Sequence, residues 1–115
     1  MTSLPESEFK PLPGYEKFVS PCPPPTPYER ELLEILIEEC AEVQQRATKM
    51  LRFGVKEVQP GQPHTNAERL SLEVGDLMKV VELCKDKHLL CQTHIDLGCV
   101  AKAKQLAKYM QHQKD

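Results

Sequence analysis

TPYERELLEILIEECAEVQQRATKMLRFG, residues 26–54, is the stretch that decides the fold. Thr26 and Glu29 give it the T-x-x-E pattern of a capping box, with a proline at the first helical position. Apolar residues then recur three and four positions apart, as they do along one face of a helix. Gly54 follows the last of them, where glycine commonly ends a helix. The stretch therefore predicts one long helix over residues 27–53.

Two further helices are predicted after a loop at residues 54–64, which contains Pro-Gly and a second proline. Thr65 and Glu68 form another capping box, and Thr93 with an acid three residues on is predicted to open the third helix. Leu89-Leu90 predicts a short helical turn between them. The predicted buried stripes are Leu70, Val74, Leu77, Val81 and Cys84 in the second helix, and Ile95, Val100, Ala103, Leu106, Ala107 and Met110 in the third.

No run of the chain alternates apolar and polar residues as a strand would, so the predicted fold class is all-α. The expected architecture is a bundle of three long helices plus the short turn, completed by oligomerisation. Three helices with broad apolar faces would leave surface uncovered in a single chain of 115 residues.

The N-terminal segment differs sharply in composition from the helical part. Eight of the ten prolines fall in residues 1–27, and proline fixes φ and lacks a backbone donor. We therefore expect an extended arm over residues 1–26, with polyproline character near its end, and a helical domain over residues 27–115. Aromatic and aliphatic residues in the arm favour packing on a neighbour, and a disordered tail is the alternative.

Composition narrows the class of function. A net charge of −2 with scattered lysines and arginines gives no basic patch for nucleic acid. Five cysteines in irregular spacing favour a reducing compartment over a disulfide framework. No apolar run approaches the roughly 20 residues of a membrane span, and the first residues lack the pattern of a signal peptide. The expected location is the cytoplasm.

Two acidic pairs carry the predicted chemistry. Glu39 and Glu42, and then Glu73 and Asp76, are each spaced i, i+3 within a predicted helix, so both carboxylates of a pair share one face. Each pair is surrounded by apolar residues. Ionised carboxylates are costly to bury together unless a cation neutralises them. Two such pairs on facing helices predict a divalent-metal site, and Mg²⁺ with a phosphate-bearing substrate suits an all-oxygen set of ligands.

These residues also resemble a known family. The motifs Glu38-Glu39-x-x-Glu42-Val43 and Glu73-Val74-Gly75-Asp76-Leu77 are similar to the EExxE(L/V) and E(x)GD(L) signature of the MazG-like all-α nucleoside triphosphate pyrophosphohydrolases. The resemblance extends over residues ~30–110, and its flanking motifs also resemble the small phage- and prophage-type members. It includes KMLRFG at Lys49–Gly54, NAERL at Asn66–Leu70 and KAKQLAKYM at Lys102–Met110.

The resemblance implies Mg²⁺-dependent hydrolysis of a nucleoside or deoxynucleoside triphosphate to the monophosphate and pyrophosphate, with Mn²⁺ as a substitute ion. Water would attack the α-phosphorus. The implied metal ligands are Glu39, Glu42, Glu73 and Asp76, and Glu38 or Glu39 is the implied residue that orients or deprotonates water. The family also implies a homodimer or homotetramer.

A triphosphate needs cationic partners, and arginine suits bidentate contact with phosphate. Asn66 could contact the sugar or base, or could cap the second helix. The candidate substrate-binding residues are Lys49, Arg52, Asn66, Arg69, Lys79, Lys102 and Lys104. For each cation, an ordinary solvated surface charge is the alternative.

Three alternatives to this function stay open from the sequence. The chain could be a helical interaction module without catalysis, or the same scaffold acting on another phosphoanhydride. Cys84, His88, Cys91 and His94 have the ligand types of a zinc site, against which packed cysteines and surface histidines are the simpler interpretation.

Overall fold

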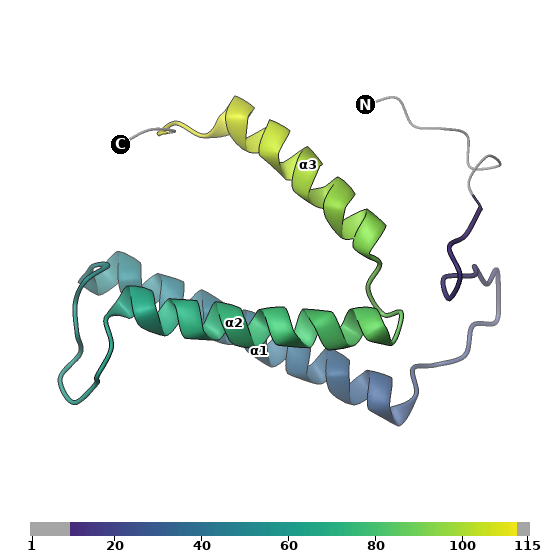
Figure 1. The fold of residues 1–115 in the computed structure, drawn as a ribbon, viewed down its shortest axis with the longest axis horizontal. Coiled ribbons are helices and arrows are strands. Elements are labelled where there is room, and N and C mark those ends of the chain that lie inside the picture. The colour runs from purple at the N-terminus through teal and green to yellow at the C-terminus, as the bar shows by residue number, and fades with distance from the viewer. Residues whose placement is uncertain (1–9, 113–115) are drawn as a thin grey trace. The chain divides into compact units, whose positions relative to one another are not determined.

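The computed structural model describes residues 10–112, which contain three helices and no strand beyond one isolated bridge. Helix α1 spans Pro27–Phe53, α2 spans Asn66–Asp86 and α3 spans Gln92–Tyr109 (Figure 1). The all-α prediction is confirmed, and α1 has the predicted bounds. Residues 10–26, the described part of the predicted arm, contain turns and bends but no helix. The first nine residues of that arm lie outside the described residues.

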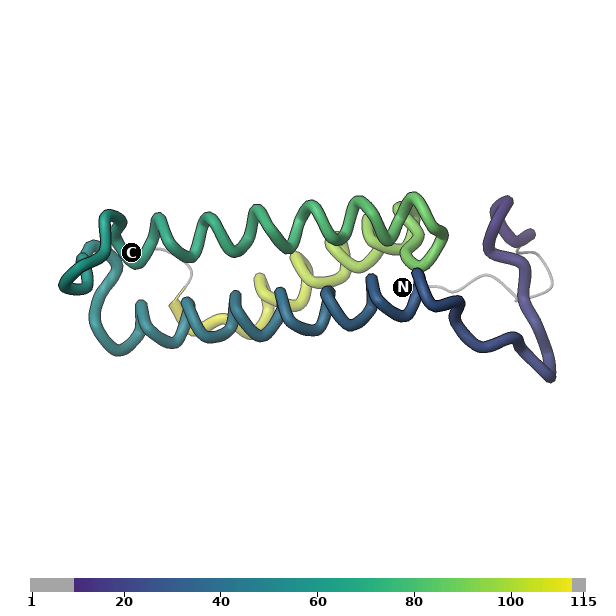
Figure 2. Tube along the Cα trace, turned by 90° about the horizontal axis from the view of Figure 1, so that it is seen from below, coloured from purple at the N-terminus to yellow at the C-terminus, as the bar shows by residue number. Residues whose placement is uncertain are grey.

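The described residues fall into two compact units. The hairpin unit spans Pro25–Leu89 and contains α1 and α2, whereas the arm unit combines residues 10–24 with residues 90–112 and contains α3. In the hairpin unit the two helices run antiparallel and side by side, joined by the loop at residues 54–65 (Figure 2). This antiparallel pairing is what lets residues from the middle of both helices meet.

Both predicted capping boxes form. At α1, the Thr26 amide donates to Glu29 Oε1 at 2.8 Å while the Glu29 amide donates to Thr26 Oγ1 at 3.2 Å. At α2, the same reciprocal bonds join Thr65 and Glu68 at 2.9 and 3.1 Å. Each box satisfies two of the backbone donors that a helix start leaves without partners. Local sequence therefore sets where both hairpin helices begin.

The start of α3 differs from the prediction. The helix begins at Gln92 with Cys91 as its N-cap, so Thr93 lies inside the first turn and does not cap it. The predicted short helical turn at Leu89-Leu90 is a pair of bends. His88 adopts a left-handed conformation with φ 59° just after α2, and the Leu89 amide donates to the carbonyl of Cys84 at 2.9 Å, so the helix ends there.

The hairpin unit has a small core. Its buried apolar residues are Leu32, Val80 and Cys84. The stripe of α2 is rotated from the predicted one, because Val80 is buried while Val74 is exposed and Val81 is half-buried. Glu73 is half-buried in this stripe, one turn after Leu70 and one turn before Leu77. A carboxylate therefore faces the helix interface where the sequence pattern predicted valine.

Helix α3 has no buried residue among those that the structure describes. Of its predicted stripe, Ile95 is half-buried, whereas Val100, Leu106 and the others are exposed. The predicted apolar face exists, but it is open in a single chain. None of the helices in the described part of the chain combines the length and hydrophobicity that a membrane span requires.

Candidate metal centre and adjoining pocket

Four carboxylates meet between α1 and α2. Glu39, Glu42, Glu73 and Asp76 each offer one oxygen, and these four oxygens all lie within 4.8 Å of one another. Glu39 and Glu73 are half-buried, whereas Glu42 and Asp76 are exposed. The two acidic pairs identified in the sequence therefore come together, each helix contributing one inner and one outer carboxylate.

The helix interface determines this geometry. Glu39 lies on the half-buried stripe of α1 between Leu36 and Val43, and Glu73 lies on the stripe of α2 between Leu70 and Leu77. Because each acidic partner follows three residues later, it lies on the same side of its helix, about one turn along. Antiparallel packing then places two pairs opposite each other.

The cluster has no cation within the described residues. None of the four carboxylates forms an ion pair with lysine or arginine, and the ion pairs found nearby in sequence are Arg30–Glu34 and Lys79–Glu82. Glu39 Oε2 and Glu73 Oε2 are shielded from solvent and lack a hydrogen-bond partner. An unsatisfied charged oxygen is unfavourable, so a proton or a cation would be the favourable partner for these two atoms.

The carboxyl groups respond to each other electrostatically. Desolvation raises the pKa of Glu39, and the neighbouring charges of Glu42, Asp76 and Glu38 raise it further. The pKa of Glu73 is raised because its protonated carboxyl can hydrogen-bond to Glu42, and desolvation and the charges of the neighbouring carboxylates raise it further. Like charges at close range favour the protonated form. A divalent cation would reverse that preference.

A pH dependence of stability follows from these two shifts. Between the ordinary glutamate pKa of about 4.3 and the raised values in the folded chain, the folded state binds more protons than the unfolded state. The unfolding free energy of the metal-free protein should therefore fall as pH rises through that window and stay lower at neutral pH. Mg²⁺ should restore the loss, because it binds the ionised folded state.

Thermal unfolding in chelator and in excess Mg²⁺, recorded across this pH range, tests that expectation. The two melting curves should coincide at acidic pH and separate as pH rises. The double variant Glu39→Gln/Glu73→Gln serves as the control, because it should show little Mg²⁺ stabilisation at any pH. If the melting temperature of the unmodified protein changed with pH in the same way with and without Mg²⁺, the expectation would be wrong.

Arg46 is a residue that the sequence analysis missed. It lies on α1 four residues after Glu42, on the same face as the acidic pair. Its side chain is half-buried, and Nη1 is shielded from solvent without a hydrogen-bond partner. The i+4 spacing from Glu42 was the available signal. A guanidinium nitrogen without a partner can donate a hydrogen bond to a phosphate oxygen.

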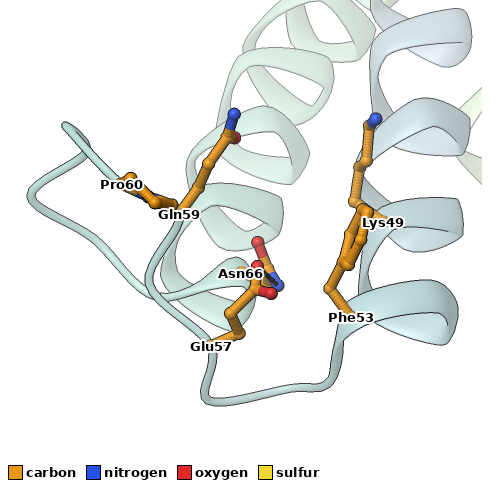
Figure 3. Close-up of a pocket in the computed structure, with 6 residues that line it drawn as sticks. All are labelled: Lys49, Phe53, Glu57, Gln59, Pro60 and Asn66. Carbon is orange, nitrogen blue, oxygen red and sulfur yellow. Dashed lines mark hydrogen bonds between the residues drawn. The ribbon is translucent and has the colours of Figure 1, made fainter.

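A pocket of about 200 Å³ lies at the loop end of the hairpin unit (Figure 3). Two of its lining residues, Lys49 and Asn66, are predicted substrate-binding residues. Phe53, at the end of α1, also lines it, and the remaining lining residues are Glu57, Gln59 and Pro60. Only the loop brings these three residues beside α1, so helix periodicity could not indicate them.

Asn66 holds the wall of this pocket together. It is 3% exposed, and its Nδ2 donates to the carbonyl of Gly54 at 2.9 Å and to Glu57 Oε1 at 3.3 Å. The helix cap is Thr65, so the predicted capping role of Asn66 is not the one it has. Instead the buried amide ties the loop to the start of α2.

Cations and an aromatic ring adjoin the pocket from α1. Lys49 Nζ lies 5.7 Å from the centroid of the Phe53 ring, and Arg52 Cζ lies 5.0 Å from the same centroid. Glu42, Arg46, Lys49 and Phe53 follow at intervals of four, three and four residues, so they share one face of α1. At 1.5 Å per residue, the pocket begins about 10 Å from the carboxylates.

The remaining predicted residues are members of neither the carboxylate cluster nor the lining of the pocket. Arg69 Nη1 donates to Gln59 Oε1 at 2.9 Å, at the edge of the loop. Lys79 is exposed and pairs with Glu82 at 3.4 Å. Glu38 is exposed beside Glu39, whose pKa it raises. Lys102 and Lys104 lie on α3, in the arm unit, where Lys102 donates to Gln105 at 3.2 Å.

Other potential metal ligands do not gather in the same way. Among residues 10–112, the four carboxylates are the only set of three or more His, Cys, Asp or Glu side chains close enough to share an ion. Cys84 is fully buried in the hairpin unit, and Cys91 instead contacts His94. The zinc alternative therefore gains no support from this part of the chain.

Gly75, between Val74 and Asp76, has open space where a Cβ would project. A glycine within a helix leaves room for the close approach of another helix or a ligand, and no helix of the hairpin unit approaches this one.

Comparisons of the chain with protein-family models, curated proteins and solved structures found no match.

Proposed function

We propose that this chain is a Mg²⁺-dependent nucleotide pyrophosphohydrolase of the MazG-like kind, which cleaves nucleoside or deoxynucleoside triphosphates to the monophosphate and pyrophosphate. The observation that carries the proposal is the group of four carboxylates within 4.8 Å, two of which have a shielded oxygen without a partner. The type of reaction is inferred from the sequence resemblance, and the geometry of the four carboxylates is compatible with that reaction.

The residues present fit a divalent cation. All four donors are carboxylate oxygens, which hard cations such as Mg²⁺ and Mn²⁺ prefer, whereas the softer metals favour cysteine and histidine. The cluster combines exposed and half-buried carboxylates, so it is reachable from solvent on one side. Glu39, Glu42, Glu73 and Asp76 would hold the ion. When bound, Mg²⁺ would neutralise charge on the phosphate oxygens and lower the pKa of the attacking water.

The chain's own residues would bind the rest of the substrate. Arg46 lies between the carboxylates and the pocket along α1, and its Nη1 lacks a partner in the hairpin unit. It would contact the phosphates, with Lys49 and Arg52 beyond it. The Phe53 ring beside the pocket offers an apolar surface for the base. A spacing of about 10 Å between ion and pocket suits a nucleotide whose phosphates lie on the metal side.

Glu38 is the proposed residue for orienting the attacking water. It adjoins Glu39 in sequence and is exposed, so a water molecule can reach it. A carboxylate that is not engaged by the ion can accept the proton that water releases. Arg69, Lys79, Lys102 and Lys104 are proposed as further phosphate contacts. Of these, Arg69 and Lys79 lie on α2, four residues before Glu73 and three residues after Asp76.

Oligomerisation is part of the proposal. Large apolar side chains are exposed on both hairpin helices, including Ile37 (69%), Leu51 (90%) and Met78 (67%). Exposed apolar surface of this kind commonly marks a protein interface. A homodimer or homotetramer would cover it and could bring a neighbour to the open side of Gly75. The proline-rich arm could lie on that neighbour, and five free cysteines suit the cytoplasm.

Product analysis tests the proposed reaction. Purified protein with Mg²⁺ and a panel of ribonucleoside and deoxynucleoside triphosphates should release pyrophosphate and a nucleoside monophosphate. Glu39→Gln and Asp76→Asn should each reduce the rate by about 10²-fold or more, because each removes a ligand of the ion. Glu31→Gln, an exposed acid on α1 outside the cluster, is the matched control and should retain full activity.

Each other result identifies a different function. Release of orthophosphate would place the cleavage at another bond. Mg²⁺ binding without triphosphate hydrolysis would favour a different phosphoanhydride substrate. If the protein neither binds the ion nor hydrolyses a triphosphate, the non-catalytic helical module is the remaining function. Its exposed apolar faces would then bind a protein partner.

A further inference from the structure

A second pocket, of about 450 Å³, lies within the arm unit, and none of its lining residues belongs to the proposed hydrolase site. Residues 10–17 form one wall, and the start of α3 forms the other. The wall from the arm is held in place because the Tyr15 hydroxyl donates to the carbonyl of Leu90 at 2.5 Å. A turn, in which the Tyr15 amide donates to the carbonyl of Leu12 at 2.9 Å, shapes the same wall.

A cysteine and a histidine meet in this pocket. Cys91 Sγ lies 3.2 Å from His94 Nδ1, and both residues line the cavity. Cys91 is also the N-cap of α3, where the positive end of the helix dipole favours a thiolate. A hydrogen bond with the His94 ring lowers the pKa of Cys91, and the backbone amides of His94 and Thr93 lower it further. Neither amide donates a helix-capping hydrogen bond to the Cys91 side chain.

The other cysteines provide a comparison. Cys84 is 0% exposed, and burial raises the pKa of its thiol, so it should be inert. Cys22, Cys40 and Cys99 are exposed free thiols, and none of them lines this pocket. Cys91 alone among these five combines partial exposure, a histidine partner and a cavity large enough for a small organic molecule.

The charges around Cys91 favour an anionic ligand. Lys10 and Lys17 line the pocket from the arm, and His94 lines it from α3. Tyr15 is the other titratable group there, and no acidic side chain of the described residues lines the cavity. Leu12 and Leu97 supply apolar walls. The matching ligand is a small molecule with a carboxylate and an apolar body.

We propose that Cys91 is a modification site that forms mixed disulfides preferentially with small anionic disulfides held in this pocket. The Cys91 thiolate attacks one sulfur of the disulfide, and a new S–S bond forms at Cys91. The original S–S bond breaks, and its electron pair leaves with the second half as an anionic thiolate. The disulfide is the oxidant, so no other reactant is needed. This proposal is independent of the hydrolase activity.

Two disulfide reagents test the proposal on the full chain. One is 5,5′-dithiobis(2-nitrobenzoate), which carries a carboxylate on each aromatic ring, and the other is the neutral 4,4′-dithiodipyridine. With less than one equivalent of the anionic reagent at neutral pH, peptide mapping should find the label mainly on Cys91. Cys91 should react several-fold faster than Cys99, because the lysines that line the pocket attract the anionic reagent and the thiol lies beside His94. Cys91→Ser should remove the fast phase.

Variants separate the charge effect from the thiolate effect. Lys10→Gln/Lys17→Gln should slow the anionic reagent several-fold and leave the neutral reagent unchanged, whereas the matched pair Lys56→Gln/Lys108→Gln, outside the pocket, should change neither rate. His94→Gln should move the pH midpoint of the Cys91 reaction upward with both reagents. Equal labelling of Cys22, Cys40, Cys91 and Cys99 by the anionic reagent would overturn the proposal. Equal slowing of both reagents in the Lys10/Lys17 variant would also overturn it.

Discussion

Glu73→Gln is expected to lower the rate of pyrophosphate release by about 10²–10³-fold while raising the melting temperature of the metal-free protein. The loss of rate reflects several kcal/mol of charge stabilisation that the ion supplies when its ligands hold it. The gain in stability has the opposite origin. Glu73 is half-buried, has an unpartnered oxygen and lies among three other carboxylates, so its charge destabilises the chain when no cation is bound.

This opposite pair of effects distinguishes a metal ligand from a residue that supports the fold. Pyrophosphate release measures the first effect, and thermal unfolding in chelator measures the second, both at neutral pH. Glu82→Gln on the same helix is the control, because Glu82 is exposed and pairs with Lys79 at 3.4 Å. A Glu73→Gln protein that kept its activity would remove Glu73 from the metal centre. A lower melting temperature in chelator would show that the carboxylate stabilises the fold.

Leu32→Ala should destabilise the protein by about 2–4 kcal/mol, the usual cost of truncating a buried leucine. Leu32 is 4% exposed and is one of only three buried apolar residues in residues 10–112. A chain with so small a core has few other contacts to compensate for a cavity. Urea unfolding at constant Mg²⁺ and constant protein concentration measures the change.

Leu51→Ala is the matched control for that measurement. Leu51 lies on the same helix and is 90% exposed, so its truncation should change the unfolding free energy by less than about 0.5 kcal/mol. The comparison should be made at low protein concentration, where an assembly would dissociate. If Leu51→Ala cost as much as Leu32→Ala under these conditions, the burial pattern of α1 described above would be wrong.

Local signals predicted the hairpin helices closely. The capping boxes at Thr26 and Thr65 act within four residues, so the sequence alone specifies where α1 and α2 begin. Gly54, with φ 102°, follows α1 as predicted, because glycine tolerates this backbone conformation. The start of α3 was predicted less well. Thr93 was predicted to cap this helix, but Cys91 occupies the N-cap position and the helix begins at Gln92.

The candidate site was predicted in part. The i, i+3 spacing within each acidic pair indicated that its two carboxylates share a face, which needs only helix geometry. Helix geometry alone could not predict that Glu39 and Glu73 would meet across the interface. Their meeting depends on which face of α2 contacts α1, and that face includes Val80 and Glu73, whereas the sequence pattern favoured Val74 and Val81. Equally spaced apolar residues on a broad face do not specify the helix rotation.

The sequence by itself determined the all-α class, the bounds of α1, the start of α2 and the four acids of the candidate metal centre. These properties depend on contacts within about one helical turn, which the order of residues specifies. Only the tertiary structure decided that the four oxygens lie within 4.8 Å, that Arg46 keeps an unpartnered nitrogen, and that Asn66 closes a loop beside Phe53. Those properties depend on helix rotation and loop path, because side chains far apart in sequence meet only after the helices pack.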